Sequence, residues 1–289
     1  MSIAGPVIDW FAANGRDLPW RRPGFTPWGA LVSEFMLQQT PVNRVLPKLD
    51  EWLTRWPTPA DLAAASPADA VRAWDRLGYP RRALNLHATA VAIVERHGGT
   101  VPSDVDLLLA LPGIGDYTAR AISVFAFGER HPVVDINIRR VIARAVHGVG
   151  QPSAAAKRDM VDMEALLPED DVAAALTNAG IMELGALVCV ARTPRCEACP
   201  IADQCRWRSL GYPSFEGVSA PKQKKYEGSD RQVRGLVLAE LRASDVPVTR
   251  AELALVWGDA DQVDRCIASL ILDGLVVDTG EAFELPGSG

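Results

Sequence analysis

Residues 108–122, LLALPGIGDYTARAI, place one proline and two glycines between two segments whose apolar residues recur at helical spacing. Glycine allows the tight turn, because it adopts positive φ angles without steric cost. The second helix then presents unpaired N–H groups at its N-terminus, where a phosphate oxygen can bind. The stretch therefore predicts two helices joined by a hairpin that holds phosphate without reading a base.

The residues around this hairpin, from 1 to 215, indicate an all-α body. Ala, Leu and Val recur at helical spacing in residues 67–77 and 83–99, and the second of these segments ends in two glycines, a typical helix stop. Alternating strand patterns are nearly absent from this part of the sequence.

The remaining residues indicate a separate small domain. Residues 216–229, EGVSAPKQKKYEGS, are polar and predict a linker. Residues 230–287 carry three helical segments and then two short strands around a Thr-Gly turn. This order predicts a winged-helix-like α/β domain.

The net charge of −6 is unevenly distributed along the chain. Residues 228–289 hold 5 basic and 11 acidic side chains, whereas residues 1–227 hold 25 of each. The neutral body can therefore carry basic patches on one face. The acidic tail favours packing or docking of a protein partner over contact with a DNA groove.

The 289 residues suffice for about two domains. The N-terminus has no basic start followed by a long apolar run, and no segment approaches membrane-spanning length. We therefore expect a cytoplasmic protein with no membrane partner.

Four of the five cysteines lie close together in the pattern C-x6-C-x2-C-x5-C. Because a cytoplasmic chain rarely keeps structural disulfides, this pattern predicts a metal site. Thiolates suit both zinc and an iron–sulfur cluster, and sulfur ligation alone does not separate the two. The predicted ligands are Cys189, Cys196, Cys199 and Cys205.

The six-residue gap in this pattern contains two arginines, Arg192 and Arg195. A loop pinned by a metal would present their charge to DNA phosphates, although ordinary surface arginines fit the pattern equally well. The isolated Cys266 is expected to be a small core residue.

Two carboxylates stand in contrasting surroundings. Glu34 is the only charge in the apolar helical segment LVSEFMLQQT, residues 31–40. It either points to water or, because desolvation disfavours the charged form, stays protonated near neutral pH. Asp135 ends a short apolar run and precedes a basic helical segment, so it is predicted to cap that helix and to stay ionised.

These features together resemble a known family. The motifs SEFMLQQT, LGY, LPGIGDYTA and VVDINIRRV, followed by the cysteine pattern, are similar in order to the MutY branch of the helix–hairpin–helix DNA glycosylases, the adenine DNA glycosylases. The resemblance covers roughly residues 6–225.

The resemblance implies a mainly α, two-lobed helix–hairpin–helix glycosylase fold with a DNA cleft. An iron–sulfur cluster domain would hold a [4Fe–4S] cluster on the four cysteines, and a winged-helix-like domain would follow. The expected boundaries are 1–27 and 132–215 for the cluster domain, 28–131 for a six-helix domain with the hairpin, 216–229 for the linker and 230–287 for the tail.

The resemblance also implies the substrate and the catalytic residues. A monomer would bind double-stranded DNA and remove adenine opposite 8-oxoguanine or guanine. Glu34 lies where the family keeps its general acid, Asp135 where it keeps the carboxylate that stabilises the sugar cation, and Asn137 where it keeps an active-site amide. Tyr117 lies where the endonuclease III branch keeps a lysine nucleophile, so base removal without strand cleavage is expected.

Further positions match DNA contacts of the family. Gln39 and Tyr79 match residues that wedge into the base stack, and Trp20 and Arg21 match the pocket for the flipped base. The other predicted DNA-binding residues are Gln38, Thr40, Arg81, Arg82, Leu111, Gly113, Gly115, Arg192 and Arg195.

The sequence departs from the family pattern at three places. Ala179 occupies a position where the family usually reads the adenine edge, so that contact is missing or supplied elsewhere. Arg76 and Pro80 replace usual residues beside Tyr79. The tail replaces a Nudix-like domain that inspects 8-oxoguanine. Two alternatives therefore stay open: a glycosylase of the same fold that acts on thymine or uracil opposite guanine, and a non-catalytic iron–sulfur DNA-binding regulator.

Overall fold

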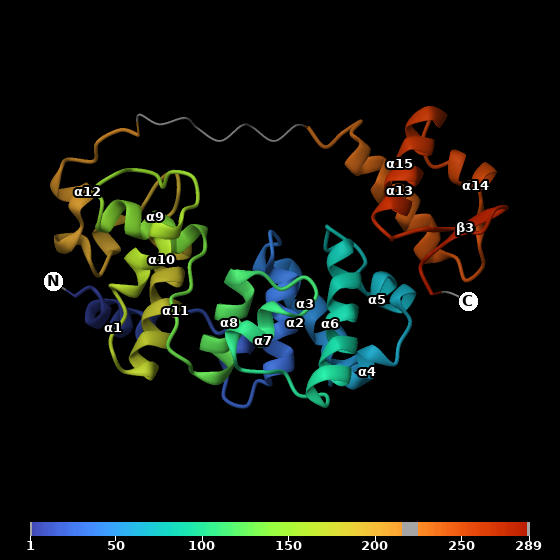
Figure 1. Ribbon diagram of the computed structural model, residues 1–289. Helices are drawn as coiled ribbons and strands as arrows, with labels where there is room; N and C mark the ends of the chain where they lie inside the picture. The colour runs from blue at the N-terminus through green and yellow to red at the C-terminus, as the bar shows by residue number, and fades with distance from the viewer. Residues whose placement is uncertain (1, 216–224, 288–289) are drawn as a thin grey trace. The chain divides into compact units, whose positions relative to one another are not determined.

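The computed structural model describes residues 2–215 and 225–287, so most of the predicted linker lies outside the described residues (Figure 1). By its internal contacts the chain divides into two compact units. The first unit comprises residues 1–30, 103–110 and 114–220, and the second comprises residues 31–102, 111–113 and 221–289.

The first unit is helical and is centred on one long helix. Its helices are α1 (Ala4–Asn14), α7 (Val105–Leu109), α8 (Asp116–Phe127), α9 (Ile136–Ala145), α10 (Lys157–Glu164), α11 (Asp171–Leu187) and α12 (Arg206–Ser209), with 3-10 turns η1 (Pro19–Arg21), η2 (Cys196–Ala198) and η3 (Ala202–Gln204). Helix α11 packs against both α1 and α9.

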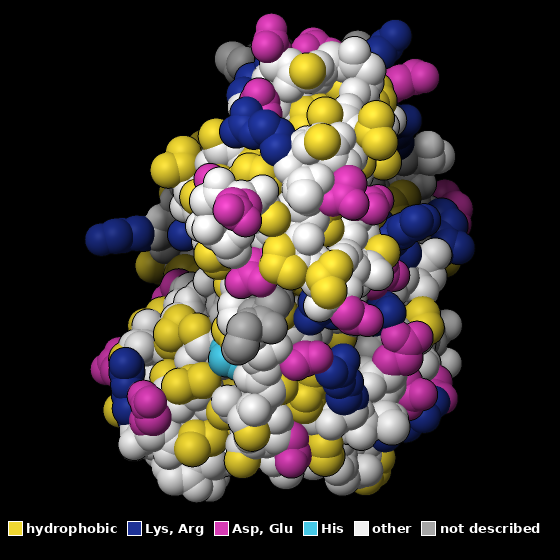
Figure 2. Space-filling model, turned by 90° about the vertical axis from the view of Figure 1, so that its right-hand side faces the viewer, with side chains coloured by type: hydrophobic (Ala, Val, Ile, Leu, Met, Phe, Trp, Pro, Cys, Tyr) yellow, Lys and Arg dark blue, Asp and Glu magenta, His cyan; other side chains and the backbone are white. Residues whose placement is uncertain are grey.

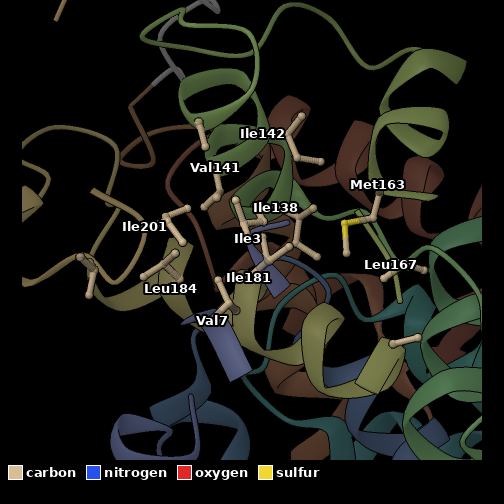
Figure 3. Close-up of a cluster of buried hydrophobic side chains, with 13 residues drawn as sticks. Ile3, Val7, Ile138, Val141, Ile142, Met163, Leu167, Ile181, Leu184 and Ile201 are labelled. Carbon is tan, nitrogen blue, oxygen red and sulfur yellow. The ribbon is translucent and has the colours of Figure 1, made fainter. Parts of the chain in front are cut away.

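Apolar side chains from these three helices form the core of the first unit (Figure 3). Val7 from α1, Ile138 from α9 and Ile181 from α11 are fully buried there. Gly180 lets α1 approach α11, because a Cβ atom at this position would lie 2.6 Å from Val7 Cγ1.

Helix α8 groups with the first unit, whereas the sequence predicts residues 28–131 in one six-helix domain. Ala121 and Val124 of α8 form a small buried cluster with Val133, against which Ala175 and Met182 of α11 pack. The apolar face of α8 is therefore covered by segments that follow it in the chain.

The second unit begins with five helices, the first of which carries most of the motif SEFMLQQT. These are α2 (Pro27–Leu37), α3 (Val42–Arg55), α4 (Pro59–Ala63), α5 (Pro67–Trp74) and α6 (Arg81–His97). Trp52 and Trp74 are fully buried and meet edge to face with ring centroids 5.7 Å apart, which is a favourable aromatic geometry. Helix α6 ends at Gly98 with φ 59°, as the two-glycine stop predicts.

The tail belongs to the second unit and confirms the winged-helix-like prediction. It contains α13 (Asp230–Ala243), β1 (Val248–Thr249), α14 (Arg250–Ala254), α15 (Ala260–Leu272), β2 (Val277–Asp278) and β3 (Ala282–Glu284). The strands form one antiparallel sheet in the order β1-β3-β2, in which Phe283 pairs with Val248 and Asp278. Helix α13 packs against α15, and Cys266 is buried, as expected of a core residue.

The predicted hairpin joins α7 to α8. Gly113 has φ 74°, and a Cβ atom there would lie 2.7 Å from Cβ of Asn85 on α6. Gly115 is the N-cap of α8 and is exposed, as is Asp116, the first residue of the helix.

The face of the molecule shown in Figure 2 carries Lys and Arg side chains interspersed with Asp and Glu, among scattered hydrophobic side chains. Within residues 2–215 and 225–287, no helix combines the length and the apolar character needed to cross a membrane.

Replacing Gly113 by Ala is expected to destabilise the fold by about 1–3 kcal/mol, because the new methyl group meets Asn85 in a backbone conformation that disfavours it. Gly128→Ala is the matched control, since Gly128 has φ 77° but open space around its Cβ position. Thermal unfolding should therefore show a larger loss for Gly113→Ala, and equal losses would disprove the close contact.

Candidate active site and cysteine centre

Glu34 lies on α2 among side chains that are removed from water. Ser33, Phe35 and Met36, its neighbours on the helix, are at most 2% exposed, and Glu34 itself is half-buried. The structure thus keeps this carboxyl in the apolar helix that the sequence predicts. Its role as an acid stays a prediction.

Asp135 is the N-cap of α9, as predicted. Its Oδ1 accepts a hydrogen bond from Ile138 N at 2.7 Å, and its Oδ2 accepts one from Asn137 Nδ2 at 2.6 Å. Burial nevertheless raises the pKa of Asp135 above its ordinary value, because desolvation outweighs these hydrogen bonds and the charge of Arg140. The expectation that capping alone governs the charge is therefore too simple.

Asn137 connects Asp135 to the first cysteine of the pattern. Its Oδ1 accepts a hydrogen bond from Arg140 Nη2 at 2.8 Å, and Arg140 Nε donates to the backbone oxygen of Cys189 at 2.7 Å. Gly185 makes room for this arrangement, since a Cβ atom there would lie 2.7 Å from Asn137 Cβ. The orientation of the candidate carboxylate is thus fixed through the start of the cysteine loop.

Tyr117 lies in the first turn of α8, directly after the hairpin. It is half-buried and packs against the cluster of Ala121, Val124 and Val133. The side chain at this position is a phenol, which lacks the amine that a covalent Schiff-base step would need.

The two predicted wedge residues share an unusual backbone conformation. Gln39 has φ 55° and Tyr79 has φ 49°, a region that non-glycine residues rarely adopt. Both side chains are exposed, Tyr79 to 52%. Strain of this kind persists where surrounding structure holds it and is frequent at functional sites.

The buried guanidinium of Arg82 forms hydrogen bonds with both of these strained segments. Its guanidinium donates to the backbone oxygens of Phe35, Gln38 and Gly78, at 2.8 Å for Phe35 and 2.9 Å for Gly78. It also donates to Thr40 Oγ1 at 3.0 Å. Arg82 therefore ties the segment that contains Gln39 to the segment that contains Tyr79.

Arg82 is only 7% exposed, and burial lowers the pKa of its guanidinium to about 10, so it stays charged at neutral pH. Its hydrogen bonds therefore support the two segments, and its contact with DNA stays a prediction. Thr40 and Leu111 are buried as well, so their side chains also serve packing. Gln38 and Trp20 are half-buried, and Arg81, Gly113, Gly115, Arg192 and Arg195 are exposed.

Sequence reasoning missed Glu183 on α11, which is 1% exposed. It accepts hydrogen bonds from Arg16 Nε at 2.8 Å, from Arg16 Nη2 at 2.7 Å and from Arg21 Nη2 at 2.9 Å. Burial alone would raise the pKa of Glu183, but the bonds from both arginines outweigh it and lower the pKa to about 2. Its sequence signal is the same as that of Glu34, a lone carboxylate in an apolar helix.

The four predicted metal ligands line one partly open cavity, with about 310 Å³ of space free of protein atoms. Arg144 donates to Cys189 Sγ at 3.3 Å, and none of the five cysteines, all within the described residues, is in a disulfide. Burial raises the pKa of the Cys199 thiol to about 11, so an electropositive metal group is needed to hold it as a thiolate. Four thiols that line one cavity together with Arg144 therefore suit a metal cluster.

Family models match two parts of the chain. Residues 32–160 match the HhH-GPD superfamily base excision DNA repair protein, and residues 189–205 match the iron-sulfur binding domain of endonuclease III. The second match begins and ends at the first and last cysteine of the centre. Fold and site thus define a base excision DNA repair protein of the HhH-GPD superfamily, whose four cysteines hold a [4Fe–4S] cluster.

Comparison with individual proteins narrows this class. An adenine DNA glycosylase of Mycobacterium tuberculosis is 52% identical over 100% of this chain and 97% of its own, and one of Mycolicibacterium smegmatis is 53% identical over 100% and 98%. A solved structure of a thermostable thymine-DNA glycosylase superposes with a TM-score of 0.65 at 27% identity, over 72% of this chain and 95% of its own. The chain belongs to the adenine DNA glycosylase family and is a hydrolase of N-glycosyl bonds in DNA.

Glu183→Gln is expected to lower the free energy of unfolding by about 3 kcal/mol at pH 7, because it removes the buried anion that pairs with the half-buried Arg16 and Arg21. Since the pKa of Glu183 is lowered, its stabilisation is present above pH 4.5 and is lost as the pH falls toward about 2. The difference between the unfolding temperatures of variant and wild type should therefore narrow over that range.

Asp17→Asn serves as the control for Glu183→Gln, because Asp17 pairs with Arg22 on the surface at 2.6 Å. Such exposed pairs contribute little, so no change in unfolding temperature is expected. Equal unfolding temperatures for Glu183→Gln and wild type would contradict the importance of the buried pair.

Asp135→Asn is expected to abolish most base release, by about 100-fold or more, without loss of stability at pH 7. Because the folded-state pKa of Asp135 is raised, the ionised carboxylate destabilises the fold as the pH rises through that pKa. Asn removes this cost and keeps an acceptor for Ile138 N. Asp170→Asn, at the exposed N-cap of α11, is the control and should change neither base release nor stability. A marked fall in unfolding temperature for Asp135→Asn alone would contradict the expected effect of its raised pKa.

Proposed function

We propose that this chain removes adenine paired with 8-oxoguanine or guanine from double-stranded DNA by hydrolysis of the N-glycosidic bond. The observation that carries the proposal is the similarity to named adenine DNA glycosylases over the whole chain, tail included. The site residues supply the chemistry that this reaction needs.

Adenine is a poor leaving group until one of its ring nitrogens is protonated. A carboxylic acid kept neutral by apolar surroundings can deliver that proton near pH 7. Glu34, half-buried beside Phe35 and Met36, fits this role of general acid. An exposed carboxylate would already be ionised and would hold no proton to give.

As the bond to the base breaks, the sugar develops positive charge. Asp135 is fixed by hydrogen bonds from Asn137 and Ile138, so its carboxylate can stabilise that charge without reorganising. The raised pKa of Asp135 reflects the cost of burying its anion, and a positive charge that develops on the sugar beside it would offset that cost.

The reaction is expected to stop at an abasic site. Strand cleavage by a glycosylase needs an amine nucleophile that forms a Schiff base with the sugar, and this chain has Tyr117 at the corresponding position. Water then completes the displacement of the base.

Arg16 and Glu183 are the proposed substitute for the base contact that is missing at Ala179. Glu183 lies one helical turn after Ala179 on α11, and its carboxylate holds Arg21, which follows Trp20 in η1. Because Glu183 is buried and both of its oxygens accept hydrogen bonds, the groups open to a base edge would be the half-buried guanidinium groups of Arg16 and Arg21.

The decisive test is a single-turnover assay on labelled duplexes with adenine opposite 8-oxoguanine, guanine or cytosine, and with thymine or uracil opposite guanine. Wild type should release adenine alone, and strands should break only after alkali. Glu34→Gln should lose release by about 100-fold or more, because its side chain has no proton of suitable acidity.

Glu51→Gln is the matched control, since Glu51 is exposed on the neighbouring helix α3 and pairs with Lys48 at 2.6 Å. Its activity should equal that of wild type. Release of thymine or uracil in place of adenine would overturn the assigned substrate, and no release by wild type from any duplex would favour a non-catalytic DNA-binding role.

A further inference from the structure

The C-terminal domain forms hydrogen bonds at the end of α5, where the loop of residues 75–81 begins. Arg242 at the end of α13 donates through Nη1 to the backbone oxygen of Asp75 at 2.8 Å. In the opposite direction, Arg72 of α5 donates to the backbone oxygen of Ser244 at 3.3 Å. These two bonds link the last turn of α5 and the residue that follows it to the end of α13.

Two further contacts join the tail to residues on either side of this loop. Asp273, which follows α15, lies 3.6 Å from Arg81 at the start of α6, and Arg234 of α13 binds the other oxygen of that carboxylate. At the end of the tail, Gly287 packs so closely on Pro67 that a Cβ atom would lie 2.9 Å from Pro67 Cδ. The contacts of the tail thus bracket the loop that runs from residue 75 to residue 81.

Tyr79 lies within this bracketed loop and depends on its conformation. Asp75 has φ 48° and Tyr79 has φ 49°, so two residues of one short loop adopt the left-handed region. The other side of the loop is held by Arg44, which donates to the backbone oxygen of Arg76, and by Arg82, which donates to that of Gly78. Such a strained loop keeps one conformation only when contacts determine it from several sides.

The charges of the tail favour support of this loop over contact with DNA. The domain is acidic overall, but the side chains it directs at the loop are an arginine and a carboxylate already paired with an arginine. An acidic surface repels phosphate, so direct binding of DNA is not its strongest contribution.

We propose that the C-terminal domain is a clamp that holds residues 75–81 in the strained conformation that presents Tyr79 to DNA, with Arg242 as its main positioning residue. This inference rests on the proposed function, in which Tyr79 wedges into the base stack. Pre-organising the loop lowers the conformational entropy that is lost when the wedge enters the duplex.

The test uses the full chain and a duplex with adenine opposite 8-oxoguanine. Single-turnover rates are measured at increasing enzyme concentration, which separates the half-saturating concentration from the limiting rate. Arg242→Ala should raise the half-saturating concentration about five- to tenfold, the effect of losing one charge-assisted hydrogen bond. The limiting rate should change less than twofold, because Glu34 and Asp135 are untouched.

A double-mutant cycle then asks whether Arg242 acts through Tyr79. Tyr79→Ala should raise the half-saturating concentration, and adding Arg242→Ala to it should cause no further change. Additive effects would show that the tail acts elsewhere and would overturn the clamp while leaving the wedge intact. No effect of Tyr79→Ala would overturn the wedge and the clamp together, without touching the assigned base chemistry.

Controls separate positioning from folding. Arg250→Ala removes an exposed pair with Asp264 inside the tail and should leave the half-saturating concentration unchanged. Arg242→Lys keeps a charged donor and should recover part of the loss. If Arg242→Ala does not fold, Arg72→Met breaks the reciprocal bond to Ser244 from the other side and must show the same dependence on Tyr79.

Discussion

Buried guanidinium groups hold the irregular segments of this protein in place. A loop that leaves secondary structure exposes backbone oxygens, which must find donors if the loop is to pack against a core. Arg82, Arg140 and Arg144 meet this need by donating to carbonyl groups around the two strained segments and the start of the cysteine loop. Helices form the scaffold, but these arginines determine the conformation of what the scaffold carries.

Three carboxylates look alike in the sequence but lie in different surroundings in the fold. Glu34, Asp135 and Glu183 each follow or interrupt an apolar run. Glu183 faces two arginines and has a pKa of about 2, whereas the pKa of Asp135 is raised by burial despite its hydrogen bonds. The surroundings in the fold, and not the local sequence, therefore set the pKa of each of these two carboxyls.

The sequence predicted those features that depend on local chemistry. The hairpin around Gly113, the cap at Asp135, the stop at Gly98 and the winged-helix-like tail follow from turn, cap and periodicity signals, and the structure confirms them. Spacing alone was enough to group the four cysteines, which line one cavity.

What the sequence did not predict depends on partners that are distant in the chain. Arg82 looks like a surface arginine until its neighbours 44 to 47 residues earlier are known. Glu183 pairs with Arg16, which lies 167 residues earlier, and the apolar face of α8 packs against α11. Local patterns carry no signal for such pairings, so the burial of Arg82 and the ion pairs of Glu183 could not be predicted from them.

The contacts between the tail and the body also bear on how this protein can evolve. Arg242 and Arg72 both bind backbone oxygens, of Asp75 and Ser244, and a backbone oxygen is present whichever amino acid occupies the position. The acceptor side of each contact can therefore drift in sequence, within the limits of backbone geometry, while the two domains stay joined. At these two contacts selection on side-chain identity therefore falls on the two arginines and not on the residues that accept from them.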